Sequence, residues 1–318
     1  MSREKLSIVC ATDDNYAPYC GIMLTSVLEN NKDRVVSAYV LVDKPLQAKQ
    51  RKRFRKLSDK YGAEIVFIMV DKSFFEKFPL KGDINNIKHW SIVTYYRLYA
   101  EDLLPKNVNK VLYLDCDIIV NKSIGSLFDM DWKDYAVGAV PDMCTEWQEY
   151  YDRLRYDRSD GYFNAGVLFM NLDYWRSHDI GKKCVDYLAS HYDRIFNNDQ
   201  DVLNVVTRDC KKNLPVSYNY QMQLRMPYFF KTFREEMKED VLGTKTPHII
   251  HYAAELKPWM TKYYFYPFNA EWHKYKRLSP WRSIRDKLPE KRAFSGFIKR
   301  FFLWPLGIMA RKPEMVME

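Results

Sequence analysis

Two aspartates separated by one residue are the sharpest chemical feature of this sequence. Asp115 and Asp117 lie in the stretch VLYLDCDIIV, residues 111–120, between two apolar halves. Ligands of open α/β sheets bind beyond the carboxyl ends of strands, and an extended chain points residues i and i+2 to one side. Two hard oxygen ligands suit Mg²⁺ or Mn²⁺, especially where diphosphate oxygens complete the shell. A turn is the alternative reading, although an unpaired carboxylate pair in apolar surroundings would be costly.

An imidazole follows another short apolar stretch. In HIIHYAAELKPW, residues 248–259, His251 would supply a third metal ligand. Lys257 would supply a compact positive charge suited to a phosphate. Taken alone, the stretch favours a satisfied core histidine and a surface lysine.

Two further polar stretches adjoin expected elements. Residues 197–201 (NNDQD) open an expected helix, so N-capping is a simple explanation, but their acid and amide groups exceed what capping needs. Residues 11–16 (ATDDNY) end the first expected strand. A base or a ribose could be held there, or the chain simply turns.

The elements that must position these side chains alternate between strand and helix. Helical spacing is found at 16–30 and 46–61, and the second of these segments is strongly basic. Buried parallel strands read as continuous apolar runs, so the alternation predicts an α/β domain with a mainly parallel central sheet. The apolar runs that predict strands are 6–11, 35–42, 64–70, 111–114, 136–140, 165–170 and 248–252. The later helices are expected at 94–100, 172–178, 181–191, 200–208 and 268–278.

The composition excludes several classes of protein. Hydrophobic residues make up 47% of the 318 residues, which excludes wholesale disorder, and 11 glycines exclude a collagen. No apolar run reaches the roughly 18 residues that span a bilayer, and no apolar signal core follows the N-terminus. The six cysteines are scattered without CxxC spacing, which predicts reduced thiols in a cytosol and no zinc site.

Together, the polar stretches resemble glycosyltransferase family 8, the retaining nucleotide-sugar transferases that include bacterial lipopolysaccharide galactosyl- and glucosyltransferases and, more distantly, glycogenin. The resemblance spans residues 6–275 and keeps the order of the family's motifs. It implies a single GT-A type nucleotide-sugar-binding domain and transfer of a hexose, galactose or glucose, from a UDP-sugar to a saccharide or lipid-linked acceptor. The matching segments are 11–16 (ATDDNY), 94–98 (TYYRL), 112–117 (LYLDCD), 163–168 (FNAGVL), 198–204 (NDQDVLN) and 251–259 (HYAAELKPW).

The resemblance implies a metal site. Asp115, Asp117 and His251 would hold Mn²⁺ or Mg²⁺ against the diphosphate of UDP, and Lys257 would touch a phosphate. The family usually has Gly where this chain has Ala254. A Cβ at that position would shift or loosen the backbone contact with the diphosphate, at little cost if φ stays negative.

The resemblance also implies a donor pocket. Asp13 and Asn15 would contact uracil and ribose, and Arg97 would reach the donor sugar or a nearby carboxylate. Asn164 and Ala165 would line the sugar pocket.

Two neighbouring residues are the expected catalytic pair. By resemblance, Asp199 and Gln200 face the reacting carbon and hydroxyls of the donor sugar. A double displacement would need a carboxylate nucleophile, for which Asp199 is the candidate. Front-face attack needs no such nucleophile, because the acceptor hydroxyl attacks from the side of the leaving group. The departing phosphate can take the proton of that hydroxyl. We favour front-face attack. An acceptor wall or lid is expected from the aromatic-rich residues 216–230, although aromatics are more often core.

The excess positive charge lies at the C-terminus. The formal net charge is +9, and residues 271–318 hold twelve Lys/Arg and five Asp/Glu, a net of +7. Residues 281–312 place Phe294, Phe297, Ile298, Phe301 and Phe302 on one helical stripe among basic residues. Such a helix lies in a membrane interface, or docks on the body of the protein.

We therefore expect a GT-A-like domain over residues 1–265 and a basic amphipathic extension over 266–318. The expected place of work is the cytoplasmic face of a cell membrane, with an anionic membrane as partner. Two alternatives stay open. A nucleic-acid-binding protein would explain the basic tail but not Asp115, Asp117 and His251, so nucleic acid is not an expected partner. A catalytically inactive sugar-binding relative is the other.

Overall fold

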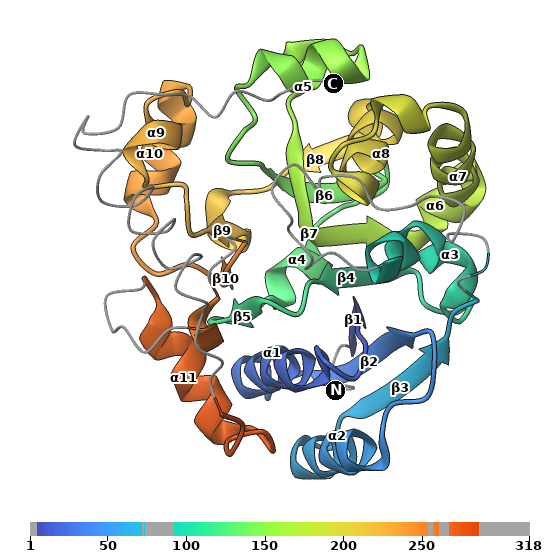
Figure 1. Ribbon diagram of the computed structural model, residues 1–318, viewed down its shortest axis with the longest axis vertical. Helices are drawn as coiled ribbons and strands as arrows, with labels where there is room; N and C mark the ends of the chain where they lie inside the picture. The colour runs from blue at the N-terminus through green and yellow to red at the C-terminus, as the bar shows by residue number, and fades with distance from the viewer. Residues whose placement is uncertain (1–4, 72, 74–91, 254–256, 261–266, 286–318) are drawn as a thin grey trace.

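A seven-stranded sheet runs through the middle of the molecule in the order β3-β2-β1-β4-β7-β6-β8 (Figure 1). The computed structural model describes residues 5–71, 73, 92–253, 257–260 and 267–285. Only β7 runs against its neighbours, so the expected mainly parallel sheet is confirmed. The strands are β1 (Lys5–Ala11), β2 (Val35–Val42), β3 (Glu64–Met69), β4 (Lys110–Leu114), β6 (Val137–Pro141), β7 (Phe163–Asn171) and β8 (Lys211–Asn213).

The side chains of the strands alternate between two apolar cores, one on each face of the sheet. On β1, Leu6, Ile8 and Cys10 belong to the first core, and Val9 and Ala11 to the second. The first core is covered by α1 (Ala17–Asn30), α2 (Ala48–Tyr61) and α11 (Asn269–Leu278). The second is covered by the 3₁₀ helix Ile92–Tyr99 with α3 (Ala100–Leu103), α6 (Leu172–His178), α7 (Ile180–Ser190) and α8 (Asn198–Val206) (Figure 1).

A second, three-stranded sheet holds the C-terminal motif against the central sheet. It contains β5 (Ile118–Val120), β10 (Ile249–His251) and β9 (Tyr220–Gln221), in the order β5-β10-β9. Because β5 starts directly after Asp117 and pairs Ile118 with His251, this sheet brings His251 to the end of β4. The remaining helices are α4 (Gly125–Asp129), α5 (Gln148–Leu154), α9 (Pro227–Phe230) and α10 (Glu235–Gly243).

The chain beyond the second sheet packs on the domain as far as it is described. Trp281 is fully buried, and its ring lies 4.8 Å from that of Phe54. A Cβ on Gly21 would lie 2.1 Å from the Trp281 ring, so this helix position of α1 must be glycine. Residues 286–318, with the expected amphipathic stripe, lie outside the described residues, and the division at residue 265 stays a prediction. None of the helices in the described part is long and apolar enough to cross a membrane.

The local elements differ from expectation in three ways, and the first is that the sequence does not predict the helices α4, α5, α9 and α10. The helix expected at residues 94–100 is a 3₁₀ helix over Ile92–Tyr99 that continues as α3. The short strands β5, β8 and β9 were not expected, because two or three residues are too few for a periodic pattern. The larger elements begin and end within a few residues of the predicted positions.

Candidate active site

A cavity of about 580 Å³ opens at one edge of the central sheet. The ends of β1, β4 and β6 meet the start of β7 there, because β7 runs in the opposite direction. The lining includes every predicted site residue: Asp13, Asn15, Arg97, Asp115, Asp117, Asn164, Ala165, Asp199, Gln200, His251 and Lys257. Segments up to 244 residues apart in the sequence therefore meet in one cavity, while Ala254 lies outside the described residues.

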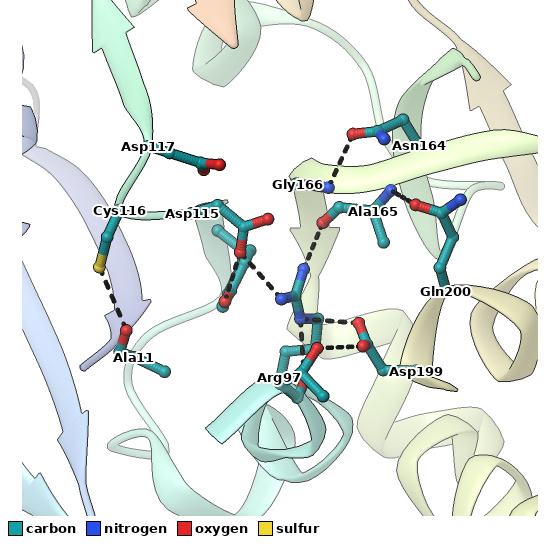
Figure 2. A network of polar contacts seen from close by, with 12 residues as sticks. Ala11, Arg97, Asp115, Cys116, Asp117, Asn164, Ala165, Gly166, Asp199 and Gln200 are labelled. Carbon is teal, nitrogen blue, oxygen red and sulfur yellow. Dashed lines mark hydrogen bonds and ion pairs between the residues drawn. The ribbon is translucent and has the colours of Figure 1, made fainter. Parts of the chain in front are cut away.

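Asp115, Asp117 and His251 form a group that could hold a metal ion. Each offers one ligand atom, and these atoms lie within 4.8 Å of one another. Both aspartates follow β4 and line the cavity, whereas the Cys116 thiol between them donates to the carbonyl of Ala11 at 3.3 Å (Figure 2). Two carboxylates and one imidazole are a suitable donor set for a divalent cation.

Gly166 makes room for this group. A Cβ at Gly166 would lie 2.3 Å from Cε1 of His251 and 2.8 Å from Oδ2 of Asp115. The backbone of Gly166 also accepts a hydrogen bond from the Asp115 N–H at 2.9 Å. The glycine therefore lets the chain of β7 approach both candidate ligands.

The hydrogen bonds around His251 place a hydrogen on its Nδ1. The backbone N–H of Gly166 donates to Oδ1 of Asn164 at 3.0 Å, which identifies that atom as the oxygen. The same oxygen accepts from Nδ2 of Asn219 at 2.9 Å, so Oδ1 of Asn219 faces Nδ1 of His251, also at 2.9 Å. Nδ1 therefore carries a hydrogen, and Nε2 is the ring nitrogen that faces Asp117, 3.4 Å away.

Asp117 is kept ionised by two neighbours. Burial would raise the pKa of its carboxyl, but Lys257 and His251 outweigh this and hold the pKa well below its ordinary value. Nζ of Lys257 lies 2.6 Å from Oδ2 of Asp117 and donates to the carbonyl of Tyr252 at 2.7 Å. The carboxylate is therefore ready to act as a ligand.

Arg97 joins the aspartate pair to the predicted catalytic residues. Figure 2 shows its guanidinium between Asp115 and Asp199, with Nη2 2.8 Å from Oδ1 of Asp115 and Nε 2.9 Å from Oδ2 of Asp199. Nη1 donates to the carbonyl of Ala165 at 2.5 Å, and the guanidinium stacks 3.9 Å from the centre of the Tyr113 ring. With a side chain 5% exposed, Arg97 is a rigid buried cation.

Asp199 is buried and held on both oxygens. Oδ2 pairs with Arg97, and Oδ1 accepts from the hydroxyl of Thr94. Burial raises the pKa of Asp199 to about 6, although Arg97 and Thr94 act in the opposite direction. N-capping was the simple explanation for residues 197–201, but Asn197 at the N-cap position makes no side-chain cap hydrogen bond. Asp201 instead accepts from the N–H groups of Phe196 and Asn197 at 2.6 and 2.7 Å.

Gln200 is fixed against β7 and Asp142. Its Oε1 accepts from the N–H of Ala165 at 3.0 Å, and its Nε2 lies 3.4 Å from Oδ2 of Asp142. That oxygen also accepts from Nδ2 of Asn164 at 3.0 Å (Figure 2 labels Gln200 and Asn164). Burial raises the pKa of Asp142. Gln200, Asn164 and Asp142 thus form one connected hydrogen-bond network at the cavity.

The family model for glycosyl transferase family 8 matches residues 7–262.

The chain belongs to glycosyltransferase family 8.

It is a UDP-sugar-dependent glycosyltransferase of that family, as the sequence motifs predicted. It is similar to General stress protein A of Bacillus subtilis, at 29% identity over 287 residues, covering 88% of this chain and 96% of that protein. It is also similar to Lipopolysaccharide 1,3-galactosyltransferase of Salmonella typhimurium, at 27% identity, covering 87% and 80% of the two chains.

A solved structure of the galactosyltransferase LgtC, in complex with donor and acceptor sugar analogs, has a similar fold. Its TM-score is 0.75 at 30% identity, and the match covers 91% of this chain and 99% of that one. The expected GT-A type domain is therefore confirmed.

Three residues of this family 8 site were missed in the sequence. Asp142 directly follows β6 and had the same strand-end signal as Asp115. Thr94 lay in a recognised motif but was given no role. Asn219, which orients His251, lies in an irregular stretch with no signal to mark it.

The N-terminal motif forms a turn at the edge of the cavity. Oδ1 of Asp13 accepts from the N–H of Tyr16 at 2.8 Å, so the carboxylate shapes the turn that leads into α1. Asp13 and Asn15 nevertheless line the cavity. Asp13 therefore shapes the turn, and the contact of both residues with uracil and ribose stays a prediction.

Proposed function

We propose that this enzyme is a metal-dependent, retaining hexosyltransferase that moves galactose or glucose from UDP to a saccharide or lipid-linked acceptor of a bacterial cell-surface glycan. The observation that carries the proposal is the convergence of Asp115, Asp117 and His251 in the cavity. Similarity to a lipopolysaccharide galactosyltransferase and to a lipopolysaccharide 1,2-glucosyltransferase of Escherichia coli supports the hexose and the acceptor class.

The donor set fits Mn²⁺ or Mg²⁺. Asp115, Asp117 and His251 would hold the ion, and the glycine at 166 leaves room for the side chains of His251 and Asp115. When bound, the cation would act as a Lewis acid that neutralises the charge developing on the UDP leaving group. Lys257 would add positive charge for a phosphate, since its ammonium lies beside Asp117.

The donor-binding roles follow the sequence motifs. Asp13 and Asn15 would contact uracil and ribose, while Asn164 and Ala165 would line the pocket of the hexose. Arg97, already paired with two carboxylates, would hold Asp115 and Asp199 in place and reach the sugar only through them.

Front-face attack agrees best with the contacts of Asp199 and Gln200. Both carboxylate oxygens of Asp199 are engaged, and an ion-paired carboxylate is a weaker nucleophile. Gln200 would present its amide to the positive ring. The departing phosphate would take the proton of the acceptor hydroxyl. Mass-spectrometric detection of a glycosyl adduct on Asp199 would refute this route.

Half-buried aromatic rings beside the cavity are candidates for the acceptor wall. Trp147 stacks on Phe229 at 5.9 Å and contacts Tyr228 and Tyr150 edge-on or tilted, each at 6.0 Å. Tyr150 also lines the cavity. Aromatic faces can pack on the C–H face of a pyranose. Trp147→Ala should raise the KM for the acceptor and leave UDP release with water as acceptor unchanged; an unaltered KM would refute the role.

The deciding experiment is UDP release from a panel of UDP-hexoses with and without Mn²⁺. We expect release to require the cation, and Asp117→Ala to lower it at least about 100-fold, since charge stabilisation of the leaving group is lost. Lys183→Ala, on the exposed surface of α7, is the control. Release of UDP by no member of the panel would favour the inactive sugar-binding alternative.

We also propose that the enzyme works at the cytoplasmic face of a membrane, attached through residues 266–318 as a peripheral protein. The net charge of this region and its aromatic stripe support the proposal. Its test is given at the scale of the whole molecule below.

A further inference from the structure

Helix α2 carries an unusual concentration of positive charge. Its 14 residues, AKQRKRFRKLSDKY, include seven Lys/Arg and one Asp. The helix is amphipathic, because Phe54 and Leu57 are buried in the first core. The exposed side presents Lys49, Arg51, Lys52, Arg55 and Lys56, which we call the α2 basic face.

The cations of the α2 basic face form no ion pair in the described part of the chain. None of the five takes part in an ion pair or hydrogen bond there, although charged surface helices commonly carry pairs three or four residues apart. Asp59 is the single acidic residue of the helix and lies in its last turn. Like charges at this spacing repel, so the helix carries a cost that a polyanionic partner would relieve.

The C-terminal end of the described chain is fastened to the same helix. The indole N–H of Trp281 donates to Oε1 of Gln50 at 2.8 Å, and Nζ of Lys60 donates to the carbonyl of Leu278 at 3.1 Å. Figure 1 shows the end of α11 beside α2. Exposed Arg282 and Arg285 extend the positive charge here. The basic extension of the sequence therefore departs from the neighbourhood of the α2 basic face.

We propose that the α2 basic face is a docking surface for an anionic lipid bilayer. A cluster of Lys and Arg near such a surface is attracted by its negative potential, at roughly a fivefold gain in binding for each cation. Single-stranded nucleic acid is a poorer fit, since its binding sites add exposed aromatic rings that stack on bases. On α2, Phe54 is buried, and the hydroxyl of half-buried Tyr61 donates to Glu29 at 3.0 Å.

The surface is separate from the catalytic cavity, and it includes none of residues 286–318. No residue of α2 lines the cavity. The proposal therefore stands or falls independently of the catalytic mechanism and of the tail.

Sedimentation of the full-length enzyme with vesicles tests the proposal. The vesicles are phosphatidylglycerol and phosphatidylcholine in equal parts, with pure phosphatidylcholine for comparison. The test variant combines Arg51→Glu, Lys52→Glu, Arg55→Glu and Lys56→Glu. The matched control makes the same charge change at exposed lysines outside α2: Lys106→Glu, Lys133→Glu, Lys183→Glu and Lys245→Glu.

We expect the α2 variant to lose at least about 30-fold in binding to the anionic vesicles, and the control less than about threefold. UDP release in solution should be unchanged in both, which also reports that the variants fold. The milder set Arg51→Gln, Lys52→Gln, Arg55→Gln and Lys56→Gln should lose at least about tenfold and serves if the Glu set misfolds. Equal binding by α2 variant and wild type would overturn the proposal. Tighter binding of wild type to duplex DNA or single-stranded RNA than to the vesicles would also overturn it.

Discussion

At the scale of single residues, the site depends on the lack of a side chain at Gly166 as much as on its charged groups. Gly166 has no Cβ, and this allows His251 and Asp115 to approach the backbone of β7. The chain of hydrogen bonds through Asn164 and Asn219 then selects the tautomer of His251. Metal ligands are commonly oriented by such outer partners, whose loss weakens metal binding about 10- to 100-fold.

Replacing Gly166 by Ala should therefore damage the proposed metal site without removing a ligand. The new Cβ would displace the His251 ring or the Asp115 carboxylate, so we expect the affinity for Mn²⁺ to fall at least about tenfold. The measurement is the free Mn²⁺ signal in electron paramagnetic resonance, with UDP present. Gly243→Ala is the control, because nothing lies within 4 Å of a Cβ there. Equal Mn²⁺ affinity in the Gly166→Ala variant and the control would contradict the prediction.

Asp199 should give the enzyme an acidic limb in its pH profile. Burial raises its pKa to about 6, so the carboxylate is mostly ionised above that pH and protonated below it. Protonation removes the negative partner of Arg97, and UDP release should fall as the pH drops through about 6. Asp199→Asn should have low activity and lack this limb. A limb of the same midpoint in the Asn variant would assign it to another group.

At the scale of elements, the sequence predicts well the helices and strands that are long enough to show a periodic or continuous apolar pattern. Apolar runs and helical spacing located the long strands and helices around β1, β2 and β4. The cavity followed, because the chemical motifs stand at strand ends that a parallel sheet gathers on one edge. The short strand β9 and the orienting Asn219 were not predictable, since they are fixed by partners 30 or more residues away.

The segment that follows α11 packs on α1, and this joint is a contact between elements that no local sequence pattern predicts. Trp281 fills the space that Gly21 leaves on α1, and its side chain is fully buried. Trp281→Ala would open a cavity there and should lower the free energy of unfolding by about 3–5 kcal/mol. Urea denaturation measures this.

Leu278→Ala is the control for that change. The Leu278 side chain is 38% exposed, so its removal should alter the free energy of unfolding by less than about 1 kcal/mol. A loss at Trp281 no larger than at Leu278 would show that the joint contributes little to stability.

At the scale of the whole molecule, most of the excess positive charge lies outside the segments that form the catalytic cavity. The net charge is +9, and residues 271–318 carry +7 of it. The cavity itself is lined by more acidic than basic side chains, which favours a cation as one of its ligands. The α2 basic face adds a positive surface to the body of the enzyme, which the small net charge of residues 1–270 conceals.

Salt should distinguish the two predicted membrane contacts. The attraction of the α2 basic face is screened by ions, with a Debye length of about 10 Å at 0.1 M and about 3 Å at 1 M. Burial of Phe294, Phe297 and Phe301 in a bilayer interface is not weakened by salt. A truncation after Arg285 keeps Trp281 and its contacts with α2, so the fold and UDP release should be retained.

On anionic vesicles, we therefore expect the truncated enzyme to bind at low salt and to dissociate at 0.5 M NaCl, while the full-length chain stays bound. Sedimentation at the two salt concentrations is the measurement. Identical salt dependence of the two proteins would refute insertion of the tail, and the α2 basic face would then be the remaining candidate for attachment.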